Sequence, residues 1–478
     1  MKSQIPNSKL QKSSKFQAPS QATRPPLHRF FGARCLVLLW SLGFGIWSFA
    51  AQAAPRPPNF IVILADDLGA KELGCYGSTR HQTPHLDRMA AEGLRFETFF
   101  ATPLCTPTRV QLMTGQYGFR TGYLGMNNKA FIPAPGSPET DIGSRFTFAD
   151  LLKSRGYATA QSGKWQLSGK LPTLVRDAGF DEYRMWAYEH NLPPGVKHPG
   201  REPNNGQHSR YWHPSIVQNG EHLPTKPGDF GPDLFNDFVM DFARRHREQP
   251  FFIYYTSVLT HGPRVETPDP AKPGVRVPAS LKSNLEYFDH LMGKLLAALK
   301  SDGLAANTYV FLVGDNGTAG DGKGTPTELG ARVPGIMWGA DVKHGVVSRA
   351  VADLTDIFAT LADLSGATLP KDRVFDGKSF ASVLRGEKPR HRDWIYSHLD
   401  DGRVLRDERW LLEIPFGNKD GKLFDCGTSR DGTGYRNVMD STVQEVKAAR
   451  ARFAAVLAQM PEPKARVLTP EETKGKKQ

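Results

Sequence analysis

Cysteine is scarce in this chain. Only four occur among 478 residues, and one of them, Cys35, lies in an apolar run near the N-terminus. The other three are too few for the disulfide framework that holds small secreted domains together. Cys75 and Cys426 are the only pair left if Cys105 has another role, and the sequence alone leaves open whether they bond. No Cys-x-x-Cys motif or His/Cys cluster is present to support a zinc site.

Acidic residues are absent from the first 53 positions, which carry seven lysines and arginines. Removing these seven charges lowers the formal net charge from +12 to +5, which favours anionic substrates and gives no reason to expect nucleic acid as a partner. The cations precede an apolar run of about 17 residues that ends in the small residues Ala51 and Ala53. We therefore expect a signal peptide at 1–53 and export to the periplasm or extracellular space. A retained anchor is the alternative, and without it we expect no stable membrane association.

Internal repeats are also absent, and the composition excludes global disorder, with 39% hydrophobic and 23% charged residues. A chain of this length can hold two or three domains. We expect a catalytic domain over 54–385 and a small domain over 386–460. The last segment, 461–478, has the composition of a disordered tail.

Apolar runs of strand length alternate with amphipathic helices from Asn59 onward. The near-continuous runs at 59–65, 250–257 and 308–314 are typical of central strands in a sheet covered on both faces. Apolar residues at helical spacing predict helices within 83–93, 284–303 and 351–366. We therefore predict an α/β fold with a large mixed, mostly parallel sheet sandwiched by helices. Beyond residue 385, short strands and a helix within 441–460 predict an antiparallel ribbon.

Polar side chains follow several of the expected strands at the point where each strand ends. They are Asp66 and Asp67 after 59–65, Asp315 and Asn316 after 308–314, His261 after 250–257, and Lys164 after a weaker strand at 157–161. Because ligands bind beyond the carboxyl ends of the strands in open α/β sheets, we expect these side chains to meet at one edge.

Hard oxygen donors dominate this set. Asp66, Asp67 and Asp315 would repel one another unless a cation neutralises them, and Asn316 adds an amide oxygen. Such donors indicate calcium or magnesium rather than zinc. Asp-Asp-Leu-Gly and Asp-Asn-Gly are also good turn sequences, and either motif alone would be interpreted as a loop. Their joint position at strand ends favours a metal site.

The stretch LCTPTRVQLMTG, residues 104–115, places Cys105 just before an expected helix, because Pro107 suits a first turn. A helix N-terminus presents free N–H groups that attract anions, and Arg109 can offer a bidentate fork to a tetrahedral oxyanion. A lone cysteine is more often a small buried apolar residue. The neighbouring arginine and proline favour a functional role here.

These motifs together resemble the type I, formylglycine-dependent sulfatases. That family carries Cys-x-Pro-x-Arg followed by Thr-Gly, present here as CTPTRVQLMTG. Its other blocks occur in order from Asn59 to Asp440: PNFIVILADDLG, GYATAQSGKW, GFDEYRMW, LTHGP, GDNG, GKGTPTELGARVPGIMWG and KLFD. The resemblance implies an alkaline phosphatase-like fold and a sulfuric ester hydrolase.

The resemblance also implies roles for individual residues. Cys105 would be oxidised to formylglycine by a separate maturation enzyme. An oxygen of that residue would join a set of calcium ligands, with magnesium the less favoured metal: Asp66, Asp67, Asp315 and Asn316. Cations would neutralise the sulfuryl oxygens: Arg109, Lys164 and Lys323. His261 would protonate the departing alcohol. Export and the small basic excess suggest a sulfated carbohydrate as substrate.

One position departs from the family pattern. Members typically have Gly-Lys-Trp-His, where the histidine assists sulfate release, whereas this chain has Gln166 in that place. Glutamine cannot take a proton at ordinary pH, so another group such as His190 would have to substitute. We assign Gln166 and His190 to substrate binding. The departure keeps two alternatives open: a phosphoester or phosphonate hydrolase of the same superfamily, and a catalytically weak or silent binder of sulfated glycans.

Overall fold

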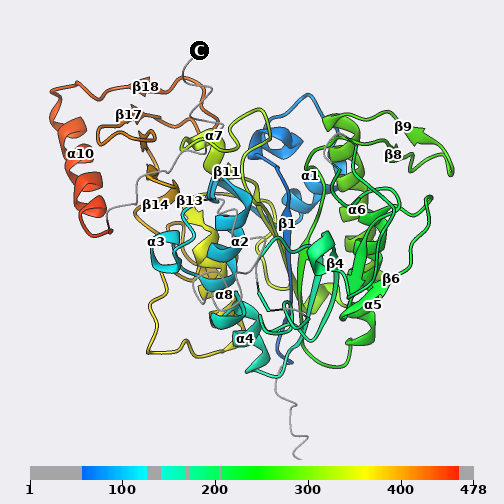
Figure 1. Cartoon of the computed structure of the whole chain (residues 1–478). Coiled ribbons are helices and arrows are strands. Elements are labelled where there is room, and N and C mark those ends of the chain that lie inside the picture. Colours follow the sequence, from blue (N-terminus) through cyan, green and yellow to red (C-terminus); the bar gives the residue numbers. More distant parts are fainter. Residues whose placement is uncertain (1–55, 126–141, 168, 171, 204–205, 462–478) are drawn as a thin grey trace, which may run out of the picture. The chain divides into compact units, whose positions relative to one another are not determined.

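The structure is a computed structural model that describes residues 56–125 and 142–461, apart from 168, 171 and 204–205 (Figure 1). The expected signal peptide at 1–53 and the tail beyond Pro461 lie outside the described residues. Among the helices that are described, none combines the length and the hydrophobicity needed to cross a membrane.

Within the described residues, the main sheet has eleven strands in the order β11-β2-β12-β10-β1-β7-β3-β4-β5-β6, and β13 pairs with β2. The strands are β1 (Asn59–Ala65), β2 (Leu94–Phe100), β3 (Ala158–Lys164), β4 (Glu182–Trp186), β5 (Ile216–Gln218), β6 (Glu221–Leu223), β7 (Phe251–Thr256), β10 (Thr308–Gly314), β11 (Arg332–Val333), β12 (Gly335–Gly339) and β13 (Val346–Asp353). The central pairs β10–β1, β1–β7, β7–β3 and β3–β4 are parallel, whereas β12 runs antiparallel to β10. The predicted mixed, mostly parallel sheet is confirmed.

Helices cover both faces of this sheet. They are α1 (Pro84–Ala91), α2 (Cys105–Thr114), α3 (Gly118–Thr121), α4 (Phe148–Lys153), α5 (Gly231–Arg245), α6 (Leu281–Ser301), α7 (Glu328–Ala331), α8 (Leu354–Ser365) and α9 (Ala381–Leu384). Single 3₁₀ turns add η1 (Ala70–Glu72), η2 (Gly74–Tyr76), η4 (Ile142–Ser144), η5 (Glu189–Asn191) and η6 (Ala305–Asn307). A separate two-stranded ribbon pairs β8 (Thr267–Pro268) with β9 (Arg276–Val277).

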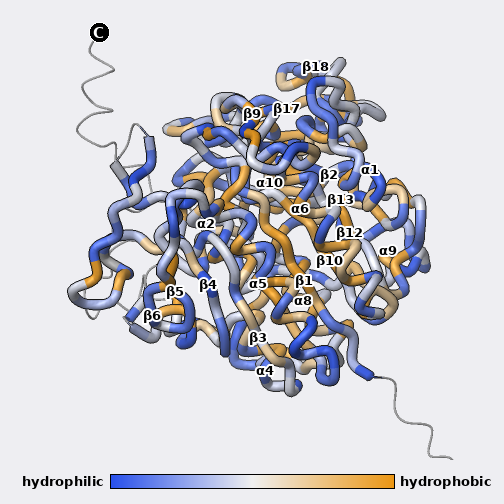
Figure 2. Tube along the Cα trace, turned by 90° about the vertical axis from the view of Figure 1, so that its right-hand side faces the viewer, coloured by the Kyte–Doolittle hydropathy of each residue, from blue (hydrophilic) through white to orange (hydrophobic). Residues whose placement is uncertain are grey.

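Alternate residues of β1 enter two different cores. Phe60, Val62 and Leu64 pack with residues of α2, α4 and α8. Ile61 and Ile63 face the other way and pack with residues of α1, α5 and α6. The hydrophobic colour of β1 and β10 in the middle of the tube in Figure 2 follows from this, because side chains alternate between the two faces of a strand and both faces are covered.

The weaker strand, predicted at 157–161, is longer in the structure, where β3 ends at Lys164. Ser162, Gly163 and Lys164 pair with β4 on one side, and Gly163 also pairs with Thr256 of β7 on the other. Strand pairing on both sides therefore overrides the poor strand propensity of this polar, glycine-containing segment. The extension places Lys164 at the carboxyl edge of the sheet.

A separate five-stranded antiparallel sheet follows the main sheet in sequence (Figure 1). It consists of β14 (Ile395–Leu399), β15 (Gly402–Arg406), β16 (Trp410–Ile414), β17 (Lys422–Asp425) and β18 (Arg436–Asn437). Helix α10 (Gln444–Leu457) buries Val446 and Phe453 against Trp410 and Leu412 of this sheet. The predicted antiparallel ribbon with a terminal helix is confirmed, and the division into domains at residue 385 stays a prediction. Cys75 and Cys426 are both free thiols.

Candidate active site

The ends of β1 and β10 bring four of the predicted metal ligands together. The two strands pair in parallel with Ala65 opposite Gly314, so the residues that follow them leave the sheet side by side. The N–H of Asp315 donates to the carbonyl of Ala65 at 2.9 Å, and the N–H of Asp67 donates to Oδ1 of Asp315 at 2.9 Å. Backbone pairing in the central sheet therefore sets the positions of these carboxylates.

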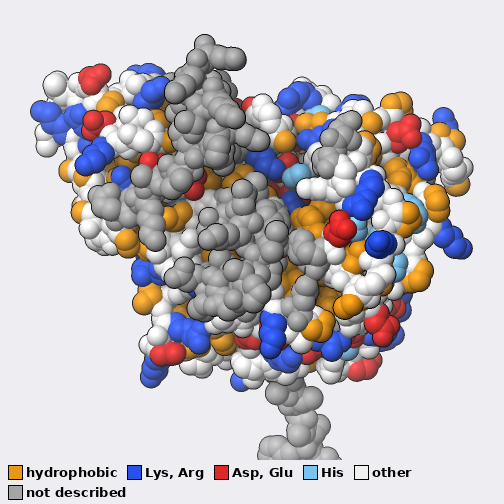
Figure 3. Space-filling view, in the orientation of Figure 1, with side chains coloured by type: hydrophobic (Ala, Val, Ile, Leu, Met, Phe, Trp, Pro, Cys, Tyr) orange, Lys and Arg blue, Asp and Glu red, His pale blue; other side chains and the backbone are white. Residues whose placement is uncertain are grey.

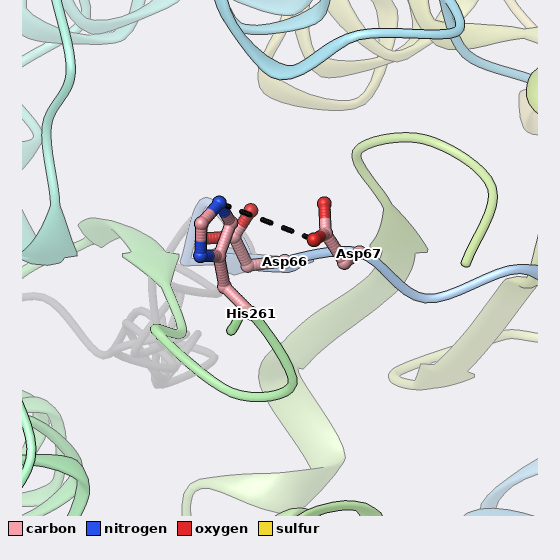
Figure 4. Close-up of side chains that lie close together, drawn as sticks. All are labelled: Asp66, Asp67 and His261. Atoms are coloured by element: carbon pink, nitrogen blue, oxygen red, sulfur yellow. Dashed lines mark ion pairs between the residues drawn. The ribbon is translucent and has the colours of Figure 1, made fainter. Parts of the chain in front are cut away.

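Asp66, Asp67, Asp315 and Asn316 are all at most 1% exposed. Nδ2 of Asn316 donates to Oδ1 of Asp67 at 2.9 Å. Ligand atoms of Asp66, Asp67 and His261 lie within 4.8 Å of one another, as Figure 4 shows for their side chains. Carboxylates gathered this tightly in a buried place need compensating positive charge.

Three cations meet these carboxylates; Arg109 and Lys164 are buried, and Lys323 is partly exposed. Nζ of Lys164 lies 2.7 Å from Oδ2 of Asp66, and Nζ of Lys323 lies 2.5 Å from Oδ1 of Asp67. The Arg109 guanidinium lies 3.3 Å from Oδ2 of Asp315 and 3.8 Å from Oδ1 of Asp66. The structure thus brings together in one network the carboxylates and cations that the sequence predicts.

The pKa values of the carboxylates respond to this network in opposite directions. Burial raises the pKa of Asp315 well above its usual range, and the negative charge of Asp66 raises it further. Burial also acts to raise the pKa of Asp66, but Lys164 and the other nearby cations outweigh it and hold that pKa well below its usual range. The raised pKa of Asp315 shows that the three cations do not balance all of the negative charge, and a further bound cation would do so.

Two oxygens in this cluster fit such a cation. Oδ1 of Asp66 and Oδ1 of Asn316 are buried and have no hydrogen-bond partner among the described residues. Buried polar atoms nearly always have a partner, and oxygen-only donor sets are those of calcium and magnesium. The residues present therefore fit a hard divalent cation.

Cys105, which the sequence places just before this helix, is the first residue of α2 and is 2% exposed. Nε2 of Gln166 lies 3.1 Å from its Sγ. Arg109, one turn further along α2, donates from Nη1 to the carbonyl of Lys164 at 2.8 Å. Burial acts to lower the pKa of Arg109 and of Lys323, but nearby negative groups raise both, and each of these two cations also interacts electrostatically with Cys105. Residue 105 therefore lies among the cations of the network.

His261 contacts the site from the segment after β7. Its Nε2 lies 3.9 Å from Oδ2 of Asp67, and its Nδ1 lies 2.6 Å from the carbonyl oxygen of Gly262. Burial lowers the pKa of His261 to about 3, with a further contribution from the positive charge of Lys164. The imidazole is therefore neutral over the physiological range.

Arg210 is a residue of the site that the sequence analysis missed. Its Nη1 lies 3.2 Å from Nδ1 of His261, and its Cζ lies 3.9 Å from the centre of the Trp186 ring. Nε of Arg210 lies 3.3 Å from Oε1 of Glu202, and the side chain of Arg210 is 2% exposed. Arg210 lies in a proline- and histidine-rich stretch with no periodic pattern, and the only signal available was an arginine among aromatic residues.

Of the two residues assigned to substrate binding, the structure describes the side chain of Gln166 but not that of His190. Gln166 adopts a positive φ of 56° and is 6% exposed, and its Oε1 has no partner among the described residues. The side chain of His190 lies outside the described part of the structure. Figure 3 shows basic, acidic and histidine side chains together in a recess beside the segments that are not described.

The arrangement combines elements of several kinds of chemistry. It has a buried side chain at a helix N-terminus, three cations, an oxygen-rich cluster that fits a divalent metal, and a neutral imidazole. Such a set can bind an anionic tetrahedral group and stabilise negative charge as it develops on oxygen. It suits transfer of a sulfuryl or phosphoryl group.

Comparisons with known proteins distinguish these chemistries. The family model described as "Sulfatase" matches residues 58–367. The chain is 32% identical to dog (Canis lupus familiaris) N-acetylgalactosamine-6-sulfatase over 398 residues, which are 78% of this chain and 73% of that protein. It is also 32% identical to human (Homo sapiens) arylsulfatase A over 416 residues, which are 80% of this chain and 78% of that protein.

Solved structures share the fold at lower identity. A structure titled Ps i-CgsB in complex with k-i-k-neocarrahexaose has a TM-score of 0.69 and 23% identity, covering 88% of this chain and 97% of that one. BT4656 in complex with its substrate D-glucosamine-2-N,6-O-disulfate has a TM-score of 0.65 and 19% identity, covering 84% and 97%. The family model and the curated relatives together show that this chain belongs to the sulfatase family and is a sulfuric ester hydrolase.

Proposed function

We propose that the protein removes sulfate from a sulfated carbohydrate, using a formylglycine made from Cys105 and a bound calcium ion. The observation that carries this proposal is the position of Cys105. It starts α2 beside the cations of Arg109 and Lys323, and beside the buried carboxylates that follow β1 and β10. A structural cysteine would need none of these neighbours.

Asp66, Asp67, Asp315 and Asn316 are the residues that would hold the metal, with an oxygen of the oxidised residue 105 as a further ligand. A calcium ion held there supplies positive charge that favours ionisation of an oxygen bound to it. The unpartnered oxygens of Asp66 and Asn316 support this assignment, because each is a buried acceptor without a donor among the described residues. Calcium is favoured over magnesium because its coordination tolerates an irregular set of oxygen donors.

Formylglycine at position 105 would supply, as its hydrate, the hydroxyl for attack on sulfur. Three side chains of this chain would bind and orient the sulfuryl group. Arg109, Lys164 and Lys323 donate to its oxygens and stabilise the charge that builds up on them. Lys323 is 18% exposed, against 1% for Lys164, and so it is the more accessible of the two lysines.

We propose His261 as the acid for the departing alcohol. As a neutral imidazole it donates an N–H hydrogen bond to the departing oxygen, and full proton transfer requires its protonated form. Arg210 can only donate, so its contact with Nδ1 favours the tautomer with the proton on Nε2, the nitrogen that faces Asp67. The carbonyl of Gly262 contacts the same Nδ1 and favours the other tautomer. We assign the proton to Nε2 because a permanent positive charge at 3.2 Å strongly disfavours an N–H at Nδ1.

The names of relatives support a carbohydrate substrate. One curated relative is an N-acetylgalactosamine-6-sulfatase, and one structural neighbour holds a disulfated glucosamine. The basic and then apolar N-terminal pattern supports export, where sulfated polysaccharides are encountered. Maturation requires a formylglycine-generating enzyme as a partner.

Mass spectrometry and paired assays test the proposal. After coexpression with a formylglycine-generating enzyme, the tryptic peptide 96–109 should show one sulfur and two hydrogens of Cys105 replaced by one oxygen. The matured protein should hydrolyse an aryl sulfate, and C105A should not. C75A is the matched control, because Cys75 lies outside the site.

Two results would overturn the proposal. Dominant activity on an aryl phosphate would indicate a phosphoester hydrolase. Unmodified Cys105 in the presence of the maturation enzyme, with binding of sulfated glycans but no turnover, would indicate a silent binder.

A further inference from the structure

A second pocket outside the candidate active site is lined by three arginines from three separate segments. Arg95 comes from β2, Arg332 from β11, and Arg430 from the loop after β17. The pocket has a volume of about 490 Å³ and is closed on another side by residues 74–77. None of its lining residues belongs to the candidate active site.

Arg430 is the most unusual member of this pocket. It is 6% exposed, and its Nη1 donates to the carbonyls of Gly427 at 3.2 Å and Ser429 at 2.7 Å. Its Nε and Nη2 are buried and have no hydrogen-bond partner, and no carboxylate pairs with it among the described residues. A buried guanidinium in this state is costly, because buried charges are normally paired.

The surrounding charges stabilise Arg430 only in part. Burial lowers the pKa of this group, and the nearby arginines Arg406 and Arg349 lower it further, whereas the carboxylate of Glu97 acts in the opposite direction without outweighing them. Arg406 is itself paired with Glu328 at 3.0 Å, whereas Arg349 is exposed. Positive charge is therefore in excess around Arg430.

The other two arginines are held against one aromatic ring. The guanidinium carbons of Arg95 and Arg332 lie 5.1 and 5.8 Å from the centre of the Tyr76 ring. Tyr76 is fixed in turn, because its hydroxyl donates to the carbonyl of Phe96 at 2.9 Å. Stacking on a ring orients a guanidinium without using its N–H groups. Nε of Arg332 donates to the carbonyl of Glu97 at 2.9 Å, so only its terminal N–H groups are left for an anion.

Two carboxylates line the same pocket, and neither neutralises it. Asp431 is exposed and accepts hydrogen bonds within its own loop, from the hydroxyl of Ser429 at 2.7 Å and the N–H of Thr433 at 2.9 Å. Glu97 is half-buried and forms no ion pair within 4.0 Å among the described residues. The pocket therefore has three cations against two carboxylates, with the buried cation unpaired.

We propose that this pocket is an anion site that binds a tetrahedral oxyanion of the sulfate class, held by Arg430, Arg95 and Arg332. The choice of sulfate rests on the sulfuric ester hydrolase activity, which produces this ion and acts on esters that carry it. Arginine forks match the oxygens of such a group, and Arg430, which lines the pocket, is a buried arginine whose charge lacks a carboxylate partner among the described residues. Free sulfate and the sulfo group of a saccharide share this chemistry.

Binding of inorganic sulfate tests the proposal. Calorimetry at constant ionic strength should find a sulfate site in the full protein that is lost, or weakened about tenfold or more, in R430M. R349M is the matched control, because it removes the same charge from an exposed arginine that does not line the pocket. R95M, which changes a half-buried residue, should also weaken this site, so the test does not depend on one variant folding.

Crystals soaked in selenate locate the anion directly. An anomalous selenium peak within hydrogen-bond distance of Arg430 supports the proposal. Equal sulfate affinity and stoichiometry in R430M and R349M, or selenate confined to the candidate active site, would overturn it. Hydrolysis of an aryl sulfate by the matured protein is measured separately, so failure of this site and failure of the proposed function are distinguishable.

The source of the anion follows from two further titrations. N-acetylgalactosamine 6-sulfate and unsulfated N-acetylgalactosamine are compared with inorganic sulfate in R349M and R430M. Tighter Arg430-dependent binding of the sulfated sugar than of sulfate assigns the pocket to a saccharide. Equal or tighter binding of inorganic sulfate assigns it to the free ion.

Discussion

Lys164 and Asp66 form a buried ion pair of 2.7 Å across the carboxyl edge of the sheet, although 98 residues separate them in sequence. Lys164 ends β3 and Asp66 follows β1, and the strand β7 lies between these two. The pair is therefore made by sheet order rather than by local sequence. Its two members have distinct proposed roles, one toward the sulfuryl oxygens and one toward the metal.

We expect K164A to lower kcat/KM for an aryl sulfate by roughly a hundredfold to a thousandfold, because it removes a donor to charge that develops in the transition state. Lys153 offers a matched control, since its ammonium is half-exposed and its ion pair with Asp181 is on the surface. K153A should retain full activity. A K164A enzyme within about twofold of the parent would show that Lys164 has no role in catalysis.

Removal of the metal should lower both activity and stability. Treatment with a calcium chelator removes the charge that balances Asp66, Asp67 and Asp315, so the thermal midpoint should fall and turnover should cease. Added calcium at about 100 times its dissociation constant should restore about 2.7 kcal/mol of stability. Differential scanning calorimetry and an aryl sulfate assay measure the two effects.

The calcium assignment has its own control. Asn316→Ala removes one proposed ligand, and the stabilisation by calcium should shrink in that variant. Asn307→Ala changes an asparagine outside the site, whose side chain donates to the carbonyl of Pro57 at 3.2 Å, and should leave the response to calcium intact. A chelator-treated protein with unchanged thermal midpoint and turnover would rule out a functional calcium ion.

Much of the fold was predictable, because its signals are local and strong. The strand at 59–65 is correct at both ends, since its apolar run is buried on both faces. The helix expected just after Cys105 is present and begins at Cys105 itself, with Pro107 in its first turn. The end of β3 was missed, because Gly163 and Lys164 join the strand through pairing with neighbours that the sequence does not reveal.

The site residues that directly follow a strand were predictable from the sequence. Asp66, Asp67 and Asp315 follow clear strands, and parallel pairing then brings them together. Arg210 lies in an irregular segment, and its contact with His261 depends on a chain path without periodicity. The same holds for Arg430, whose lack of a partner is a property of tertiary packing and has no sequence pattern.

Gln166→His should change the rate-limiting step. Gln166 donates through Nε2 toward residue 105 and cannot accept a proton, whereas a histidine at this place could act as a base during sulfate release. We expect the variant to raise steady-state turnover of an aryl sulfate by about tenfold or more. Gln166→Leu removes the hydrogen bond without adding a base and should lower turnover. No gain in Gln166→His would mean that another group already serves as the base.

Acid should destabilise the protein partly through His398, which lies far from the proposed metal ligands in the separate antiparallel sheet. Its side chain is 1% exposed and stacks on Tyr396 with ring centres 5.7 Å apart. Burial lowers its pKa from 6.5 to about 4, so the folded protein binds this proton more weakly than the unfolded chain does. The contribution is therefore present above pH 6.5 and is lost as the pH falls toward 4.

The loss should reach about 3 kcal/mol, because one pKa unit corresponds to about 1.4 kcal/mol. Urea unfolding of the parent and H398Q from pH 8 to 4 should show a flatter pH profile for the variant, even if its stability at pH 8 is lower. His344 is exposed, so H344Q is the control and should keep the slope of the parent. Parallel profiles for the parent and H398Q would contradict the prediction, because the acid sensitivity would then come from groups other than this buried imidazole.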